Sequence, residues 1–344
     1  MDNNTKTALV IGGGLAGMEA AIKVGQAGYD VVLVEKGPEL GGIAGRLYSS
    51  FPKWENPQDL INYKKQQIGD LPNIKVLLDS TVKTVQRKDG KFEIEIEGSS
   101  GGEHRLEVNA AVLATGFELF DCKVYGEYGY GIYPNVMNSL EFEDQLKKWG
   151  SGQNLHSAPK SVAFFKCVGS RDRSKGLPYC SKICCMYTAK QAGLVKDVFP
   201  DSKAYVFYMD YRAAGKDYEE FTRSVIETKH VRYVRGRPSK VLAENGRLIV
   251  RAEDTLMGVP IEVEADMVVL AAAVVPRPET QRLAQMFGAR TDEYGFVESL
   301  TFMPAKTADN VFFAGGCGFA VETQGAQYQG AAAAAEVLAL FSKA

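Results

Sequence analysis

The sequence of 344 residues predicts an α/β protein built from two doubly wound, Rossmann-like units. The first observation is that residues 7–17 form a short apolar run followed by the glycine-rich segment that joins strand to helix in nucleotide-binding βαβ units. The second is an internal repeat, because the strand pattern of the first 120 residues returns between residues 161 and 276. In this repeat Phe92–Ile96 corresponds to Arg247–Arg251, and the apolar run before Thr115 corresponds to Met267–Val275.

The first unit contains a complete Gly-x-Gly-x-x-Gly fingerprint in its required context. Thr7–Ile11 is the expected first strand, Val31–Val34 is the second, and the helix between them stops near Gly28. Glu35 closes the second strand, close to the spacing of about 20 residues that the fingerprint requires. Its carboxylate can accept both hydrogen bonds from an adenosine ribose. A glycine-rich turn without a ligand is the alternative, but here every part of the fingerprint is present in order.

Each glycine of the fingerprint has a physical role. Gly12 permits the tight turn, Gly14 lets the backbone approach a pyrophosphate, and Gly17 lets the helix pack on the strand. The first helical residues, Leu15 and Ala16, belong to a turn whose N–H groups point at the phosphates. The sequence therefore predicts a dinucleotide site in the first unit.

Three further segments favour FAD over NAD. Glu39–Gly42 resembles the double-glycine segment of glutathione-reductase-like FAD proteins, Val112–Gly116 resembles their Ala-Thr-Gly strand end, and Asn310–Gly316 resembles their Phe-Ala-Gly-Asp segment. A helix from about Gln324 would direct its positive N-terminal dipole at the flavin. Gly316 replaces the aspartate that holds the ribityl chain in that family, so this hydrogen bond must come from elsewhere. The candidate cofactor-binding residues are Gly12, Gly14, Leu15, Ala16, Gly17, Glu35, Lys36, Gly42, Val82, Ala114, Thr115, Gly116, Gly315 and Gly316.

The second unit lacks the fingerprint at the corresponding place. Ser161–Phe165 matches the first strand of the first unit, and the alignment puts Lys166, Val168 and Arg171 where the three glycines should be. Side chains at these positions would keep the backbone away from a pyrophosphate. We therefore expect no nicotinamide cofactor to bind there in the usual way.

Cysteines occupy the place of the lost fingerprint. Four of the six cysteines fall within 19 residues, at Cys167, Cys180, Cys184 and Cys185. Cys167 ends the first strand of the second unit, and the segment from Cys180 is predicted to open a helix that runs to about Val198, with Cys180 and Cys184 on one face. Four thiolates near a helix N-terminus, with lysine and arginine close by, would form a cage for a cluster.

Several interpretations of these cysteines remain open. Four-cysteine ligation suits an iron–sulfur cluster, which we favour, or zinc, although the spacing C-x12-C-x3-C-C differs from the paired C-x2-C of zinc sites. A dithiol–disulfide pair lacks its C-x2-C motif, and adjacent cysteines strain a disulfide. Inert core cysteine is common singly but not expected four times in so short a span. Cys122 and Cys317 stand alone and are expected to be small buried side chains.

The cysteine motif resembles that of one family. Cys-Val-Gly-Ser-Arg-Asp from Cys167, Tyr-Cys-Ser at 179–181, and Cys184–Cys185 followed by Lys190 look like the A subunit of heterodisulfide reductases, and the resemblance covers nearly the whole chain. It implies FAD beside a four-iron, four-sulfur cluster, with electrons passing among the subunits of a complex. It also implies the cluster ligands Cys167, Cys180, Cys184 and Cys185. Lys190 becomes a candidate to approach the flavin ring, with a solvated helix lysine as the alternative.

The resemblance is to the short members of this family. The longer methanogen members carry ferredoxin-like C-x2-C-x2-C-x3-C runs, and none occurs here. The chain therefore resembles the short forms found in sulfur-oxidising prokaryotes, which argues against flavin-based electron bifurcation. The implied partners are other subunits of a heterodisulfide-reductase-like complex, and a homodimer is expected by analogy with related flavoproteins. The alternatives are an NAD(P)H-dependent flavin disulfide reductase that uses a cysteine dithiol, and a scaffold with structural FAD and zinc.

Composition and charge bear on the partners of the protein, on its location and on other metal sites. The 40 Lys and Arg against 42 Asp and Glu leave a net charge of −2, which predicts no nucleic-acid or anionic-membrane partner. No apolar run reaches the ~18 residues that suggest a spanning helix, and residues 1–4 lead directly into a strand, so we expect a cytoplasmic protein. The histidines at 104, 156 and 230 are too scattered for a histidine metal site. We predict an FAD unit from residues 1–155 and 276–344, and a degenerate unit from residues 156–275.

Overall fold

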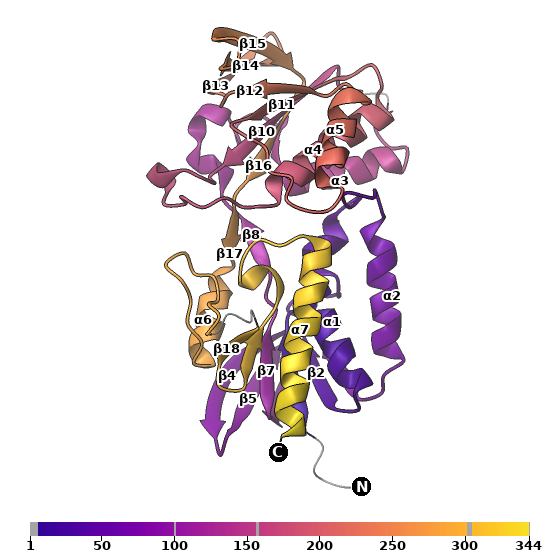
Figure 1. Cartoon of the computed structure of the whole chain (residues 1–344), viewed down its shortest axis with the longest axis vertical. Coiled ribbons are helices and arrows are strands. Elements are labelled where there is room, and N and C mark those ends of the chain that lie inside the picture. The colour runs from indigo at the N-terminus through magenta and orange to yellow at the C-terminus, as the bar shows by residue number, and fades with distance from the viewer. Residues whose placement is uncertain (1–5, 100, 156–157, 301–304, 344) are drawn as a thin grey trace. The chain divides into compact units, whose positions relative to one another are not determined.

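The structure is a computed structural model that describes residues 6–99, 101–155, 158–300 and 305–343. His156 and residues 1–4, on which two of the sequence-based expectations depend, lie outside the described residues. The chain divides into two compact units (Figure 1). Unit 1 comprises Met1–Gly45, Pro57–Glu118 and Val275–Ala344, and unit 2 comprises Arg46–Asn56 and Leu119–Val274.

Unit 1 is built on a six-stranded sheet with the order β18-β19-β7-β1-β2-β3. Its strands are β1 (Thr7–Ile11), β2 (Asp30–Val34), β3 (Ile74–Leu77), β7 (Ala110–Leu113), β18 (Lys306–Ala308) and β19 (Val311–Phe313). Every pair is parallel except β18 with β19. An antiparallel meander adds β4 (Ser80–Lys88), β5 (Lys91–Gly98) and β6 (Glu103–Val108).

The two faces of this sheet carry different layers because successive strand residues point to opposite sides. Ala8 and Val10 of β1 belong to a core shared with the helices α1 (Leu15–Gln26), α2 (Pro57–Gly69) and α7 (Thr323–Ser342). Leu9 and Ile11 belong to a second core with the meander and α6 (Pro278–Met286). Figure 1 shows α1, α2 and α7 together on one side of unit 1.

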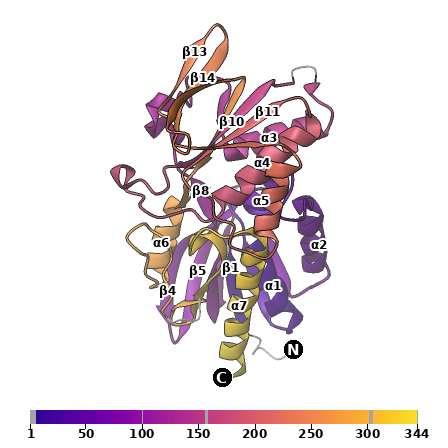
Figure 2. The same cartoon turned by 45° about the horizontal axis from the view of Figure 1, so that its top comes forward.

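Unit 2 is built on a parallel five-stranded sheet with the order β12-β11-β10-β16-β9. The strands are β9 (Val136–Asn138), β10 (Ser161–Val168), β11 (Lys203–Tyr208), β12 (Arg232–Arg235) and β16 (Met267–Ala272). The helices α3 (Ser139–Gly150), α4 (Cys184–Val198) and α5 (Tyr218–Glu227) share one core with the sheet and lie together in Figure 2. The meander β13 (Lys240–Glu244), β14 (Arg247–Asp254) and β15 (Val259–Ala265) shares the other core.

The predicted repeat is visible in the strand pairing. In unit 1, β1 pairs with β2 and β7, and in unit 2, β10 pairs with β11 and β16, with a meander before β7 and before β16. The predicted strand Met267–Val275 is interrupted, however. Strand β16 ends at Ala272 because the Ala273 carbonyl accepts the Phe120 amide at 2.8 Å, and the chain continues in β17 (Val274–Pro276), which pairs with β8 (Phe117–Leu119).

The predicted boundaries between the units are wrong at residues 119–155. We expected this segment in the FAD unit, but it contributes β9 to the sheet of unit 2 and α3 to the core of unit 2. Residues 46–56 also belong to unit 2, although they were expected in the first unit. Phe51 and Trp54 hold them there by ring contacts with Tyr218 and Phe221. This exchange depends on pairing between distant residues, such as Val136 of β9 with Val268 of β16, which no local sequence pattern indicates.

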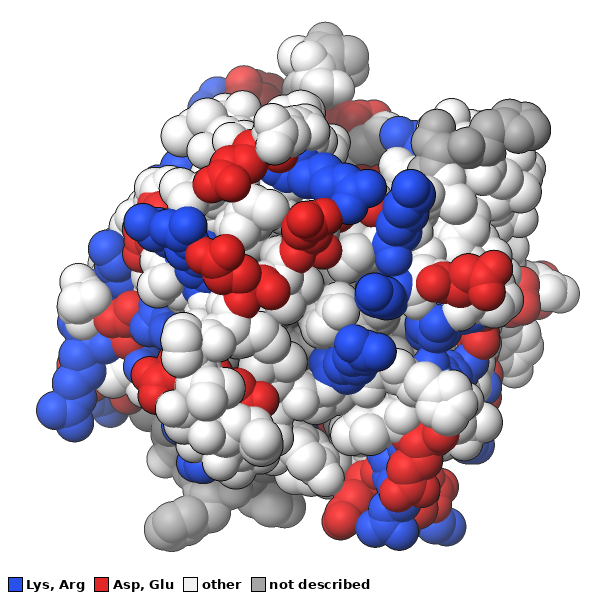
Figure 3. All heavy atoms as spheres, turned by 90° about the horizontal axis from the view of Figure 1, so that it is seen from above, with Lys and Arg blue, Asp and Glu red and all other residues white. Residues whose placement is uncertain are grey.

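Basic and acidic side chains are interspersed on the face shown in Figure 3, as a net charge of −2 suggests. None of the helices in the described part of the chain is long and apolar enough to cross a membrane.

Gly330→Ala is expected to lower the free energy of unfolding by about 2 kcal/mol, because the new methyl group would lie 2.3 Å from the Ala16 carbonyl oxygen and push α7 away from α1. The gain in helix propensity, about 1 kcal/mol, is smaller. Gly69→Ala is the matched control, because a Cβ there meets no atom within 4 Å. Urea unfolding of both variants checks this, and a Gly330→Ala protein as stable as the control would contradict the close packing.

Candidate functional site

The glycine turn after β1 has the geometry that the fingerprint predicts. Gly12 has a φ of +110°, and a Cβ there would lie 2.2 Å from the Ala114 carbonyl oxygen. A Cβ on Gly17 would lie 1.9 Å from the Gly12 carbonyl oxygen, so α1 approaches the end of β1 as closely as glycine allows. Gly14 differs from both, because a Cβ there meets no heavy atom within 4 Å. The backbone at Gly14 thus faces open space, as close approach of a pyrophosphate requires.

The start of α1 offers hydrogen-bond donors at this open space. Gly14 is the residue that caps the helix, and it has no side chain to bond the first amides. The amides of Leu15 and Ala16 have no partner within the helix, since the first intrahelical bond runs from the Met18 amide to the Gly14 carbonyl. An uncapped helix N-terminus beside open space can bind an anion.

The double-glycine segment lies against the glycine turn. The Gly41 amide donates to the Gly13 carbonyl at 2.9 Å. A Cβ on Gly42 would lie 3.1 Å from the Gly14 Cα atom, and the φ of Gly42 is +56°. The two glycine-rich segments together form one surface without side chains at the N-terminus of α1.

Glu35 stabilises the turn as well as facing the site. Its two carboxylate oxygens accept the Gly13 amide at 2.6 Å and the Gly37 amide at 2.8 Å. Each carboxylate oxygen has two lone pairs, so the second lone pairs remain as acceptors for ribose hydroxyls. The structure therefore gives Glu35 a role in holding the loop in addition to the predicted one.

The other predicted residues of unit 1 lie at strand ends near α6. Three of them contact this helix: Lys36 through an ion pair with Glu279, Val82 through its carbonyl and Arg282 at 3.2 Å, and Thr115 through the Thr280 hydroxyl at 2.7 Å. Ala114 is buried at the end of β7, and Gly116 has a φ of +73° with no atom near its missing Cβ. Helix α6 thus closes one edge of the candidate site, which no sequence motif indicated.

Gly316, where the related FAD proteins have aspartate, has a structural reason to lack a side chain. It lies with Gly315 in a short 3-10 helix, Gly315–Cys317, after β19. A Cβ on Gly316 would lie 2.4 Å from Cδ1 of Phe117. The Gly315 amide donates to the Gln329 side chain on α7 at 2.8 Å. The phenylalanine ring therefore takes the volume that an aspartate side chain would need.

Gly316→Asp, which restores the residue found in the related FAD proteins, is expected to weaken FAD binding at least tenfold and to lower the melting temperature, because the new side chain overlaps the Phe117 ring. The double variant Phe117→Ala with Gly316→Asp is expected to recover binding. Fluorescence titration of the apoprotein with FAD measures both. Unchanged or tighter binding in the single variant would contradict the steric explanation.

In unit 2 the structure brings three of the four clustered cysteines together. Cys167 lies at the end of β10 with a φ of +61°, where the pairing of β10 with β16 shifts register. Cys184 and Cys185 begin α4, and the Cys184 thiol shares hydrogen bonds with Cys167 and Cys185. These bonds raise the pKa of Cys184 well above its ordinary value, and they lower the pKa of Cys167 to about 7 and that of Cys185 to about 5.

The predicted start of this helix is wrong. We expected Cys180 to share a helix face with Cys184, but α4 begins at Cys184. Lys182 adopts a φ of +55°, which a right-handed helix excludes, and the Ile183 amide turns back to the Ser181 carbonyl at 2.5 Å. Cys180 lies in the loop before the helix, and its Sγ accepts the Lys182 amide at 3.4 Å. The predicted end of the helix at Val198 is confirmed.

Cations surround these thiols. The side chain of Lys166 hydrogen-bonds Cys185 and contributes to its lowered pKa, after the larger effect of the Cys184 hydrogen bond. Arg171 interacts with the charges of Cys167 and Cys180 and forms an ion pair with Asp210 at 2.7 Å. Two of the three positions that replaced the fingerprint glycines thus supply positive charge to the cysteines.

A side-chain network holds the loop between Cys167 and Cys180. Asp172 accepts the Tyr125 hydroxyl at 2.6 Å and pairs with Arg237 at 3.1 Å. Hydrogen bonds from Ser174 and Tyr125 keep the pKa of Asp172 below its usual range, so this carboxylate stays charged. The loop is thereby tied to the segment 122–128 and to the start of the meander.

The side chains near the start of α4 can be compared with what an iron–sulfur cluster, the group that the cysteine motif implies, requires of its ligands. The set of candidate ligands consists of thiols alone, which suits iron–sulfur clusters and zinc. The hydroxyl oxygen of Tyr233 is buried beside Cys185 without a hydrogen-bond partner among the described residues. Across residues 6–343, apart from the undescribed gaps, no three His, Cys, Asp or Glu side chains are arranged around a single metal ion. The chemistry fits a cluster, whose cysteines bind separate iron atoms, and it also fits a dithiol.

Lys190 is not the solvated lysine that was one of its two predicted alternatives. It is 1% exposed and forms an ion pair with Glu143 at 2.6 Å, and it donates to the Ser49 carbonyl at 2.8 Å. The same carboxylate accepts the Gln191 side chain at 2.6 Å and the Tyr48 amide at 2.9 Å. Lys190 thus anchors residues 46–56 to unit 2, and its contact with a flavin stays a prediction.

Glu143→Gln is expected to lower the free energy of unfolding by about 3 kcal/mol or more, because it leaves the Lys190 ammonium buried without a counter-charge. Asp144→Asn is the matched control at the next position. It breaks the half-exposed pair between Asp144 and Arg46, which is expected to cost less than about 1 kcal/mol. Urea unfolding distinguishes the two, and equal losses would contradict the buried pair.

Comparison with known proteins now bears on this site. The family model Pyridine nucleotide-disulphide oxidoreductase matches residues 6–163. The iron-sulfur A subunit of the CoB–CoM heterodisulfide reductase of Methanocaldococcus jannaschii is 32% identical over 86% of this chain and 58% of its own length. The A subunit of the H(2):CoB-CoM heterodisulfide,ferredoxin reductase of Methanothermobacter marburgensis is 32% identical over 90% of this chain and 60% of its own. The chain is a relative of the heterodisulfide reductase A subunits.

This relationship confirms the family resemblance predicted from the cysteine motif. The chain spans about three fifths of the length of these curated relatives. The thioredoxin reductases of T. acidophilum and Lactococcus lactis superpose with a TM-score of 0.67 at 15% identity, over 97% and 99% of this chain and 98% and 100% of theirs. This likeness confirms the predicted fold of two Rossmann-like units. The relatives and the structural neighbours are reductases.

Proposed function

We propose that this relative of the heterodisulfide reductase A subunits is an electron-transfer protein that binds FAD in unit 1 and a four-iron, four-sulfur cluster in unit 2. The main support for this proposal is the difference between the two units at the end of their first strands. The first strand of unit 1 ends in a glycine turn with open space at Gly14, whereas the equivalent strand of unit 2 ends in Lys166 and Cys167, beside two further thiols. Such a chain has one nucleotide site and one thiol site in place of two nucleotide sites.

The residues of unit 1 have separate tasks in holding FAD. The glycine turn and the first amides of α1 would take the pyrophosphate, and Glu35 would take the ribose of the adenosine. Lys36, Gly42, Val82, Ala114, Thr115, Gly116 and Gly315 would line the remainder of the site. Because Phe117 excludes a side chain at Gly316, the ribityl chain would be bound by other groups of this chain.

In unit 2 the proposed ligands are Cys167, Cys180, Cys184 and Cys185. Cys180 is more exposed than the other three and lies in a loop, so it would complete the set from outside. When bound, FAD exchanges two electrons and the cluster one, so that together they connect two-electron and one-electron carriers.

The setting of this activity is also proposed. The related proteins are named as subunits of heterodisulfide reductases, and we propose that this chain works with other subunits of a heterodisulfide-reductase-like complex, as a homodimer in the cytoplasm. Oxidation of sulfur compounds is the proposed process.

Anaerobic purification of the full chain with assays for FAD, iron and acid-labile sulfide tests the proposal. We expect about one FAD, four iron and four sulfide per chain, and an EPR signal after reduction. Flavin without iron, in a protein that also fails to take up a cluster on reconstitution, would contradict it.

Cys184→Ser is expected to abolish the iron and sulfide content and to leave FAD bound, because the nucleotide fingerprint lies in the other unit. Cys122→Ser is the matched control, a buried cysteine of unit 2 outside the cluster. It should retain both groups. Loss of FAD in Cys184→Ser would show that the two sites do not form independently, and loss of iron in the control would contradict the assigned ligands.

A dithiol disulfide reductase is the second candidate function, and the hydrogen bonds of Cys184 with Cys167 and Cys185 favour it. Those bonds place thiols close enough for redox exchange without any metal. In that case NADPH would bleach the flavin rapidly in metal-free protein. In the cluster protein we expect no such bleaching, since Lys166 and Arg171 replace the glycines of the second nucleotide site.

A further inference from the structure

Lys166 is a buried cation at the centre of unit 2. It is 4% exposed and occupies the position of the first fingerprint glycine, at the end of β10. Its ammonium donates to the Asp210 carbonyl at 3.2 Å and hydrogen-bonds the thiol of Cys185. A buried ammonium is costly unless its charge is compensated.

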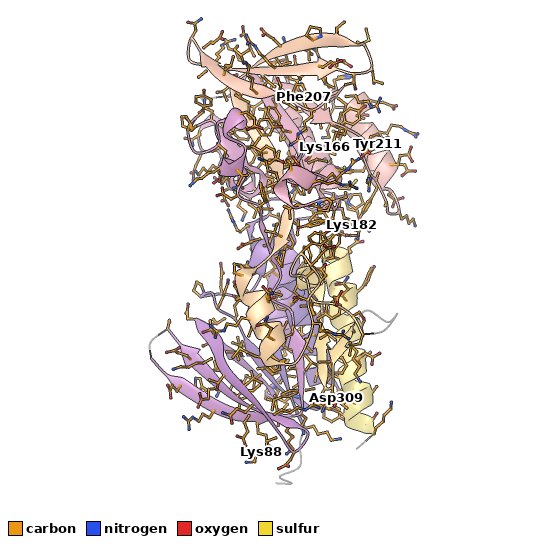
Figure 4. The ribbon with its side chains drawn as sticks, turned by 90° about the vertical axis from the view of Figure 1, so that its left-hand side faces the viewer. Lys88, Lys166, Lys182, Phe207, Tyr211 and Asp309 are labelled. Carbon is orange, nitrogen blue, oxygen red and sulfur yellow. The ribbon has the colours of Figure 1, made fainter. Side chains whose placement is uncertain are left out.

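No carboxylate compensates Lys166. Within the part of the chain that the structure describes, no Asp or Glu oxygen lies within 4.0 Å of its ammonium. The nearby Asp210 carboxylate is bound by Arg171 at 2.7 Å and by Arg212 at 3.7 Å. Two aromatic rings lie beside Lys166 instead, because the centres of the Tyr208 and Tyr211 rings are 5.5 and 5.9 Å from the ammonium. Figure 4 shows Lys166 and Tyr211 beside each other in unit 2.

The hydroxyl group of Tyr233, close to Lys166 and Cys185, is a hydrogen-bond donor without an acceptor among the described residues. The Tyr233 ring packs against Tyr208 and Tyr211, and its hydroxyl is buried. Lys166 and Tyr233 therefore bring a positive charge and an unused O–H group to the Cys185 side of the cluster cysteines. The Tyr233 hydroxyl is free to donate to an anionic group bound there, and the Lys166 ammonium would stabilise its charge.

We infer that Lys166 is the fixed counter-charge of the group bound by the cysteines and that it raises the reduction potential of that group. The inference rests on the proposed iron–sulfur cluster. Reduction of a four-iron cluster from the 2+ to the 1+ state takes one electron, from the reduced flavin in the proposed function, and needs no proton. The added negative charge is stabilised by a nearby cation in a poorly solvated site. Lys166 is thus a residue that tunes the potential without binding iron.

Redox titration of the full chain with dithionite, followed by EPR, tests this directly. In Lys166→Gln the ratio of reduced to oxidised cluster at a fixed potential should fall about tenfold, which is about 59 mV for a one-electron couple. Lys166→Arg should recover most of the shift because it keeps the charge. Lys175→Gln is the control, since that lysine lies over the Tyr125 ring, 5.0 Å from its centre, and is not among the groups that shift the pKa of Cys167 or Cys185. It should leave the potential unchanged.

Tyr211→Ala is a second variant that leaves Lys166 and the cysteines in place and removes one of the two rings beside the ammonium. Tyr211 is 40% exposed, and its removal opens the Lys166 ammonium to water, which screens its charge. The potential should shift in the same direction as in Lys166→Gln but less. If Lys166→Gln binds no cluster, the reduction potential of the cluster in Tyr211→Ala tests the inference in its place.

The outcomes separate the inference from the proposed function. If Lys166→Gln binds the full complement of iron and its potential is unchanged, the inference is overturned and the proposed cluster is unaffected. If only Tyr211→Ala binds a cluster, an unchanged potential in that variant has the same meaning. A wild-type chain that takes up no cluster would overturn the proposed function. A lowered potential in Lys166→Gln that Lys166→Arg fails to restore would also contradict the inference, because charge would then not be the cause.

Discussion

A Cβ on Gly17 would lie 1.9 Å from the Gly12 carbonyl oxygen, and this close approach of α1 to the end of β1 is the contact on which the first unit depends. It lets the helix begin directly at the strand end, so that its uncapped amides face the open space at Gly14. The double-glycine segment and Glu35 then fit against the same turn. A side chain at Gly12 or Gly17 would separate the helix from the strand end and so disrupt the anion site.

The second unit has the same strand order around its first strand but fills the equivalent space. Lys166, Cys167 and the thiols at the start of α4 stand where the backbone of a nucleotide site would lie open. Burying the Lys166 ammonium there carries an electrostatic cost that a nearby anionic group offsets. The aromatic rings around Lys166 and the unpaired hydroxyl of Tyr233 indicate the same requirement. The replacement of the nucleotide site by a thiol site in unit 2 explains how two units of the same fold can hold different groups.

Much of this could be predicted from the sequence, because the first strand of each sheet, the repeat and the fingerprint are local patterns with a clear period. What could not be predicted depends on contacts between distant residues. Lys190 and Glu143 are 47 positions apart, and nothing in either segment marks them as partners. The left-handed conformation of Lys182, which delays α4 to Cys184, also has no sequence signal, because lysine rarely adopts it. The overlap between Gly316 and Phe117 explains a departure from the FAD-protein pattern that the sequence alone left open.

The central claim is that one chain holds a flavin and an iron–sulfur cluster, and counting electrons tests it most directly. Anaerobic titration of the full chain with dithionite, followed by visible absorption and EPR together, measures how many electrons each chain accepts. The account predicts about three, two for the flavin and one for the cluster. An end point at about two, reached with no EPR signal from iron, would contradict it.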